Sequence, residues 1–223
     1  MNITILTKIF LIIIYSLLPP AIIAYTHKLI YKDKNKYGVH LQYISKYIIT
    51  VSFLPLLFIK GLDLGVLPQN GWSVGFILIT IAMALLGLIR AIKFKNVFFY
   101  NAGIMASFME EILYRGIIYG LTFSIWKNQW VALGVSSLLF GVWHLKNYYW
   151  GGLKSSIIQL LYTALFYGPI FGIARIFTGD IYLAVLLHYL TDATCALAPD
   201  WMRGWLVQGG RGKHYDDINS GIN

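Results

Sequence analysis

The stretch WSVGFILITIAMALLGLIRAI, residues 72–92, decides the fold class of this 223-residue chain. Its only charged side chain is that of Arg90, which stands close to its end. A helix that crosses the hydrocarbon core of a bilayer needs roughly 20 mostly apolar residues, and this run has that length and character. We therefore predict that residues 72–92 form a transmembrane helix.

Further apolar runs of the same kind occupy most of the remaining sequence, and each is predicted to be a membrane span. They are residues 9–25, 41–59, 98–123, 130–145, 155–177 and 181–198. The whole chain is 58% hydrophobic and only 12% charged, whereas about a quarter of the residues of an average soluble domain are charged. This composition excludes an ordinary soluble domain. It predicts an all-α fold, a polytopic transmembrane helix bundle of about seven spans.

Three regions follow from the distribution of runs and motifs. Residues 1–97 are predicted to be N-terminal transmembrane helices without motifs, residues 98–198 to be a core that bears the motifs described below, and residues 199–223 to be a cytoplasmic tail. Within the core, small residues would let helices pack closely. They are Gly116, Gly120, Gly134 and Gly141.

The net charge of +9 is distributed as expected for membrane loops. Most basic side chains fall after the first, third and fifth runs or in the tail: Lys28, Lys32, Lys34, Lys36, Arg90, Lys93, Lys95, Lys146, Lys154, Arg203, Arg211 and Lys213. The alternate side holds Lys8, Lys60, Lys127 and Arg175. The positive-inside rule then predicts a multi-pass cell-membrane protein with its N-terminus outside and its C-terminus in the cytoplasm. Membrane lipid, and not nucleic acid, is the expected partner of this charge.

A set of ionisable residues lies inside the predicted spans of the core, where each is costly and therefore suggests a functional site. Glu111 and Arg115 are four residues apart, share one helix face and are predicted to form an ion pair, which could serve structure alone. Glu110 points about 100° away on the same helix, so its partner must come from another span. His144 is the candidate partner.

The chemistry of these residue types indicates hydrolysis. A carboxylate beside a histidine, as proposed for Glu110 and His144, can activate a water molecule. His188 and Asp192, four residues apart, can face one cavity from the last span. An imidazole held by a carboxylate can donate a hydrogen bond to an oxyanion. The other histidines fall in predicted loops or the tail and are assigned no role: His27, His40 and His214.

The segments EEILYR (110–115), FGVWH (140–144) and HYLTD (188–192) resemble the three motifs of the CAAX-protease and bacteriocin-processing family, also called the Abi family. That family includes the type II CAAX prenyl endopeptidases and their bacterial relatives. Each motif alone is common, but three in order on separate spans are specific. The resemblance covers roughly residues 98–198. It implies an intramembrane glutamate-type endopeptidase, a hydrolase that uses no metal or other cofactor.

The resemblance also implies roles for the individual residues. Glu110 with His144 would activate the water that attacks a peptide bond, and His188 with Asp192 would stabilise the oxyanion. Glu111 and Arg115 would support the site. Eukaryotic members of the family typically have asparagine at the position of Asp192. An ionised aspartate cannot donate to an oxyanion, so Asp192 would act through its neighbouring histidine.

Several readings stay open beside this one. Glu110, His144 and His188 are also residue types that bind zinc, and a chelator-insensitive activity would remove that reading. A non-catalytic membrane immunity or scaffold protein, or a proton-coupled transporter, is the alternative to an enzyme. The single Cys195 excludes an intramolecular disulfide. Richness in Ile, Lys, Asn and Tyr favours a bacterial source, and the expected substrate is a peptide or protein at the membrane.

Overall fold

The computed structural model describes residues 3–35, 37–94 and 106–197. Across these ranges the chain is helical and has no β-strand, so the predicted all-α class is confirmed for them. The α-helices are α1 (Ile5–His27), α2 (Gly38–Val51), α3 (Gly71–Phe94), α5 (Ala106–Glu111), α6 (Tyr119–Trp126), α7 (Gln129–Trp143), α8 (Tyr148–Tyr162), α9 (Gly168–Thr178) and α10 (Tyr182–Leu197). Segments of π-helix (Lys28–Lys32, Ile112–Ile118, Thr163–Tyr167) and of 3₁₀-helix (Leu54–Phe58, His144–Asn147) extend or join them.

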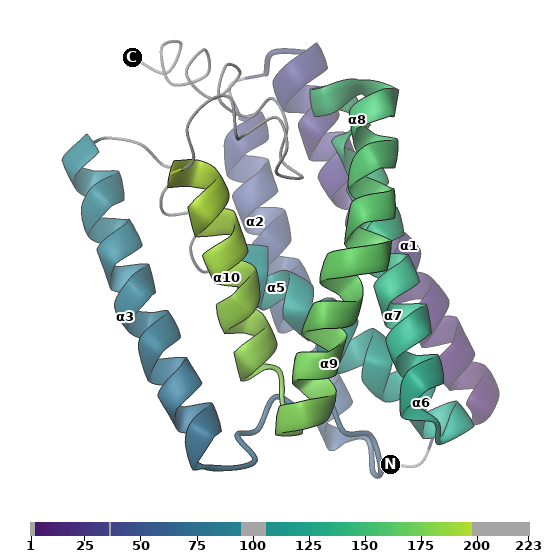
Figure 1. The fold of residues 1–223 in the computed structure, drawn as a ribbon. Helices are drawn as coiled ribbons and strands as arrows, with labels where there is room; N and C mark the ends of the chain where they lie inside the picture. Colours follow the sequence, from purple (N-terminus) through teal and green to yellow (C-terminus); the bar gives the residue numbers. More distant parts are fainter. Residues whose placement is uncertain (1–2, 36, 95–105, 198–223) are drawn as a thin grey trace.

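The helices lie side by side and run alternately up and down between two ends of a bundle (Figure 1). In the described ranges they make seven helical passes, in the same order as the predicted runs. The start of the predicted run 98–123 lies outside the described residues. Among the described residues, the helices Ile5–Lys32 and Gly151–Thr178 are long and apolar enough to cross a membrane by themselves, and the other apolar helices are shorter. The number of spans therefore stays a prediction.

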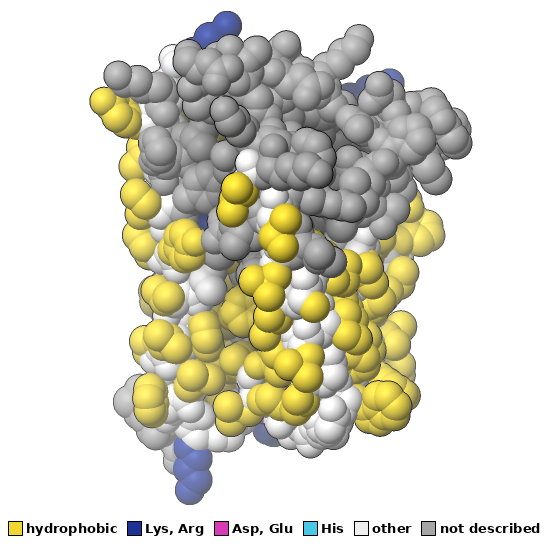
Figure 2. Space-filling view, turned by 90° about the vertical axis from the view of Figure 1, so that its left-hand side faces the viewer, with side chains coloured by type: hydrophobic (Ala, Val, Ile, Leu, Met, Phe, Trp, Pro, Cys, Tyr) yellow, Lys and Arg dark blue, Asp and Glu magenta, His cyan; other side chains and the backbone are white. Residues whose placement is uncertain are grey.

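The outer surface of the bundle is apolar, as a lipid environment requires. Large hydrophobic side chains point outward along its length, including Phe177, which is 84% exposed. On the face that carries α3, the described side chains are mostly hydrophobic, and a basic side chain projects at the lower end (Figure 2). Trp72, Trp126 and Trp130 are exposed at helix ends, which is where tryptophan gathers at a membrane interface. These features indicate a membrane protein.

The core is built around the π-helical segment Ile112–Ile118, all of whose residues are buried. Glycines let neighbouring backbone approach closely: a Cβ on Gly116, inside this segment, would lie 3.1 Å from the carbonyl oxygen of Leu64, which precedes α3. A Cβ on Gly141 would lie 2.7 Å from the carbonyl oxygen of Leu160, so α7 and α8 touch through backbone there. A Cβ on Gly134, in contrast, would meet nothing within 4 Å, so the predicted close packing is wrong at that position.

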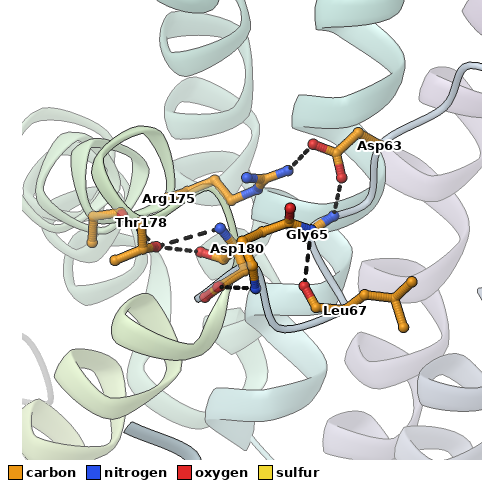
Figure 3. Close-up of polar contacts among 8 residues, drawn as sticks. Asp63, Gly65, Leu67, Arg175, Thr178 and Asp180 are labelled. Atoms are coloured by element: carbon orange, nitrogen blue, oxygen red, sulfur yellow. Dashed lines mark hydrogen bonds and ion pairs between the residues drawn. The ribbon is translucent and has the colours of Figure 1, made fainter. Parts of the chain in front are cut away.

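A group of polar contacts joins α9 and the turn between α9 and α10 to the segment that precedes α3 (Figure 3). Asp180 is completely buried in this turn. It accepts a hydrogen bond from the backbone amide of Gln69, in the segment before α3, and another from the hydroxyl of Ser73, near the start of α3. Nearby, the Nη2 atom of Arg175 lies 2.9 Å from Oδ2 of Asp63. Because α10 starts directly after this turn, these polar contacts help to position the helix that carries His188.

Candidate active site

Glu111 and Arg115 form the ion pair that their spacing predicts. The distance from Nε of Arg115 to Oε2 of Glu111 is 3.1 Å, and both side chains are fully buried. Glu111 ends α5, and the chain continues as the π-helix Ile112–Ile118 instead of as a regular α-helix. Single turns of π-helix are rare and occur often at functional sites. The pair thus lies where the α-helix changes into a π-helix.

Arg115 connects this pair to two other helices. Its Nη2 atom donates a hydrogen bond to the backbone carbonyl of Gly168, the first residue of α9, at 2.9 Å. The guanidinium carbon lies 4.4 Å from the ring centroid of Phe140 and 5.5 Å from that of Phe171. A buried arginine held between aromatic rings is also stabilised by cation–π attraction. Helices α7 and α9 therefore hold the side chain in one orientation.

His188, from α10, approaches both glutamates. Its Nδ1 atom lies 2.7 Å from Oε1 of Glu111, and its Nε2 atom lies 3.8 Å from Oε2 of Glu110. The ring stacks on Phe171 at 5.1 Å. Because a carboxylate only accepts, Nδ1 is the donor of the short bond. The sequence pattern had paired His188 with Asp192, whose side chain lies outside the described residues, and it did not reveal the contact with Glu111.

Glu110 is buried at the end of α5, and each of its two carboxylate oxygens faces a different basic side chain. Its Oε1 atom lies 3.7 Å from Nζ of Lys146, and its other oxygen faces His188. Lys146 belongs to the 3₁₀ turn His144–Asn147 that follows α7. The sequence had counted this lysine only as a loop charge. No local signal could reveal the contact, because the two residues are 36 positions apart.

His144 is half-buried at the end of α7, two residues before Lys146, whose ammonium group contacts Glu110. Its Nδ1 atom lies 2.9 Å from the backbone carbonyl oxygen of Phe140, so Nδ1 carries the proton and donates a hydrogen bond to that oxygen. In the neutral ring, Nε2 then holds the lone pair that can accept a proton from water. The predicted acid and histidine are thus in one neighbourhood, with the histidine in the tautomer that a base requires.

His27 corrects an expectation from the sequence. It had been placed in a solvated loop, but it is the last residue of α1 and is buried. Its Nδ1 atom lies 3.1 Å from the backbone carbonyl of Lys146 and donates a hydrogen bond to it. The apolar run ends before His27, so hydropathy alone had ended the helix too early. The contact links α1 to the turn that carries His144.

In the described part of the chain, no group of three or more His, Cys, Asp and Glu side chains is arranged to hold a metal ion. Glu110, His144 and His188 are neighbours, but they do not form such a group. The carboxylate of Glu110 faces the imidazole of His188, and these are residue types that suit proton transfer and oxyanion binding.

Comparison with known proteins gives one match. Residues 92–194 match the model of a family described as type II CAAX prenyl endopeptidase Rce1-like. The matched segment is slightly less than half of the chain and contains all three motif segments. It confirms the resemblance for this region and implies a protease. No curated protein and no solved structure matches the chain.

Proposed function

On the premise that residues 92–194 belong to the type II CAAX prenyl endopeptidase Rce1-like family, we propose that the protein is an intramembrane endopeptidase. It hydrolyses peptide bonds of membrane-associated peptides or proteins, by a glutamate-type mechanism that needs no metal. The observation that carries this proposal is the buried carboxylate of Glu110, which faces Nε2 of His188 at 3.8 Å and Nζ of Lys146, two residues after His144, at 3.7 Å. Richness in Ile, Lys, Asn and Tyr favours a bacterial source, which counts against prenylated tails as the substrate.

The proposed reaction begins with a water molecule between Glu110 and His144. This pair takes a proton from the water as its oxygen attacks the carbonyl carbon of the scissile bond. The carbonyl oxygen becomes an oxyanion, which accepts a hydrogen bond from Nε2–H of the doubly protonated His188 ring. The proton then passes from the pair to the amide nitrogen, the carbon–nitrogen bond breaks, and a carboxylic acid and an amine leave.

The other members of the predicted set act through these three residues. Glu111 accepts from Nδ1 of His188 and so directs the opposite edge of that ring toward Glu110. Arg115 supplies the counter-charge for Glu111. We assign to Asp192 an indirect part in oxyanion stabilisation, through His188, one helical turn away on α10.

We also propose a multi-pass cell-membrane location with the N-terminus outside and the C-terminus in the cytoplasm. The segments Lys28–Lys32 and His144–Asn147 are in contact through His27 and Lys146, so two of the lysine-bearing connections lie at the same end of the bundle. The positive-inside rule assigns that end to the cytoplasm. Cysteine labelling of the Lys28–Lys32 segment from the two sides of the membrane tests this orientation.

The decisive experiment compares the membrane peptides of cells that express the wild-type protein, Glu110→Gln or His144→Ala. Loss of a general base lowers turnover by about 10²- to 10⁴-fold, so a precursor should accumulate in both variants. Asp33→Asn is the matched control, because Asp33 is an exposed acid outside the site and its removal should leave processing intact. Processing by purified wild-type protein should survive a chelator.

Other outcomes would decide against the proposal. If both variants are stably produced and no precursor accumulates, the enzyme reading fails and a scaffold or immunity role is favoured. If Glu110→Gln instead abolishes proton uptake by vesicles that contain the protein, proton-coupled transport is favoured. Chelator-sensitive hydrolysis would restore the zinc reading. Accumulation of a prenylated precursor would identify prenylated tails as the substrate class.

A further inference from the structure

Lys146 is a nearly buried cation in the turn that follows α7, and the reaction described above does not use it. Its side chain is only 8% exposed. Lysine is almost never buried unless its ammonium group is paired, since removing that charge from water is costly. The sequence offers no motif that includes Lys146. Its burial therefore needs an explanation from the site.

Contacts from two directions hold this lysine. The Nζ atom lies 3.8 Å from the ring centroid of Trp143, an indole that is itself completely buried. A lysine ammonium at this distance from an indole ring is attracted by the π-electrons. On the backbone side, the ring of His27 donates a hydrogen bond to the carbonyl of Lys146. Helix α1 thus anchors the turn while Trp143 sets the direction of the side chain.

Held in this way, the ammonium group meets one oxygen of Glu110. Nζ lies 3.7 Å from Oε1, whereas Oε2 of the same carboxylate faces Nε2 of His188 at 3.8 Å. The two oxygens therefore face different partners, and the two contacts together favour the present direction of the carboxylate. The neighbouring Glu111 has its own cation in Arg115. Each glutamate thus has one basic side chain besides histidine as a partner, so neither histidine is needed as the sole counter-ion.

We propose that Lys146 is a positioning residue of this site, which supplies the counter-charge of Glu110 and fixes the direction of its carboxylate. The inference rests on the proposed peptidase function for its consequence in turnover. Lys146 acts through Glu110 and does not touch the reacting bond. Its loss leaves the base misdirected, and a small misplacement of a reacting group is enough to lower turnover by about 10²-fold.

The first test measures turnover of the precursor that accumulates in Glu110→Gln cells, with purified full-length protein. Lys146→Met should lower kcat by at least about tenfold and change KM by less than about twofold, because the lost interaction orients the base and does not bind substrate. Lys146→Arg restores the charge and should recover most of kcat. Lys154→Met, which removes an exposed lysine of α8, is the matched control and should retain full activity. A rise in KM with unchanged kcat would show instead that Lys146 binds substrate.

The second test needs no substrate, so it separates this inference from the proposed function. The midpoint of thermal unfolding in detergent is measured for Lys146→Met, Glu110→Gln and the double variant. In the wild-type background Lys146→Met should lower the midpoint by at least about 4 °C, because a buried charge loses its partner. With Gln at position 110 the same change should have little effect.

Equal shifts in the two backgrounds would overturn the pairing of Lys146 with Glu110, whether or not the protein is a peptidase. A strong coupling in a protein that cleaves nothing would leave the ion pair in place and reject only its catalytic consequence. If Lys146→Met does not fold, Lys146→Gln in the Glu110→Gln background provides the comparison. Failure of that variant to fold as well would show that the lysine is required for structure independently of Glu110, which contradicts the inference.

Discussion

The buried pair of Glu111 and Arg115 allows a quantitative test of the core of the site. Arg115→Met removes a fully buried guanidinium and leaves the carboxylate of Glu111 with His188 as its remaining partner. Removing one member of a buried ion pair costs about 3 to 5 kcal/mol, since the remaining carboxylate loses the guanidinium that balances its charge. For a chain of this length each kcal/mol lowers the unfolding midpoint by roughly 2 to 4 °C. The expected fall is therefore about 6 to 20 °C.

The assay is a double-mutant cycle measured by tryptophan fluorescence during thermal unfolding in detergent. The variants are Arg115→Met, Glu111→Gln and the two combined. Because no charge is left alone in the combined variant, its loss of stability should be smaller than the sum of the single losses by about 2 kcal/mol or more. Additive losses, equal to the sum within about 0.5 kcal/mol, would refute the reasoning, because they would show that the two charges do not stabilise each other.

Two further expectations compare glycines that differ only in their surroundings. Gly65→Ala should destabilise the protein by roughly 2 to 5 kcal/mol, because the new Cβ would strain a backbone with φ of 59° and would stand 2.4 Å from the guanidinium of Arg175. Gly61→Ala has a similar φ of 77° but open space around the new Cβ, so it should cost only about 1 to 2 kcal/mol. Equal losses in the free energy of unfolding, measured by denaturant titration, would contradict the close contact at Gly65. Gly141→Ala should lower the unfolding midpoint, because it overpacks the contact of α7 with α8 by about 1 to 3 kcal/mol. Gly134→Ala, in open space, should raise the midpoint slightly, and the opposite order of the two midpoints would refute this packing.

The sequence by itself determined those features that depend on composition or on local spacing. A long apolar run in a membrane folds as a helix, because a helix lets every backbone N–H and C=O group find its hydrogen-bond partner inside the segment. The all-α class of the described residues follows from this. The pair of Glu111 and Arg115 could also be predicted from the sequence, since residues four apart lie on one helix face wherever that helix packs. The three motif segments predicted, without any geometry, the resemblance that the family model confirms for residues 92–194.

Only the tertiary structure decided which side chains meet across helices. His188 contacts Glu111 from a different helix, and Lys146 contacts Glu110 across a separation that no periodic pattern encodes. His27 is buried because α1 continues beyond its apolar run and reaches the turn after α7. Side-chain spacing specifies a helix face but not the neighbour that covers it. The neighbour depends on how whole helices pack, and that packing is set by many weak contacts at once.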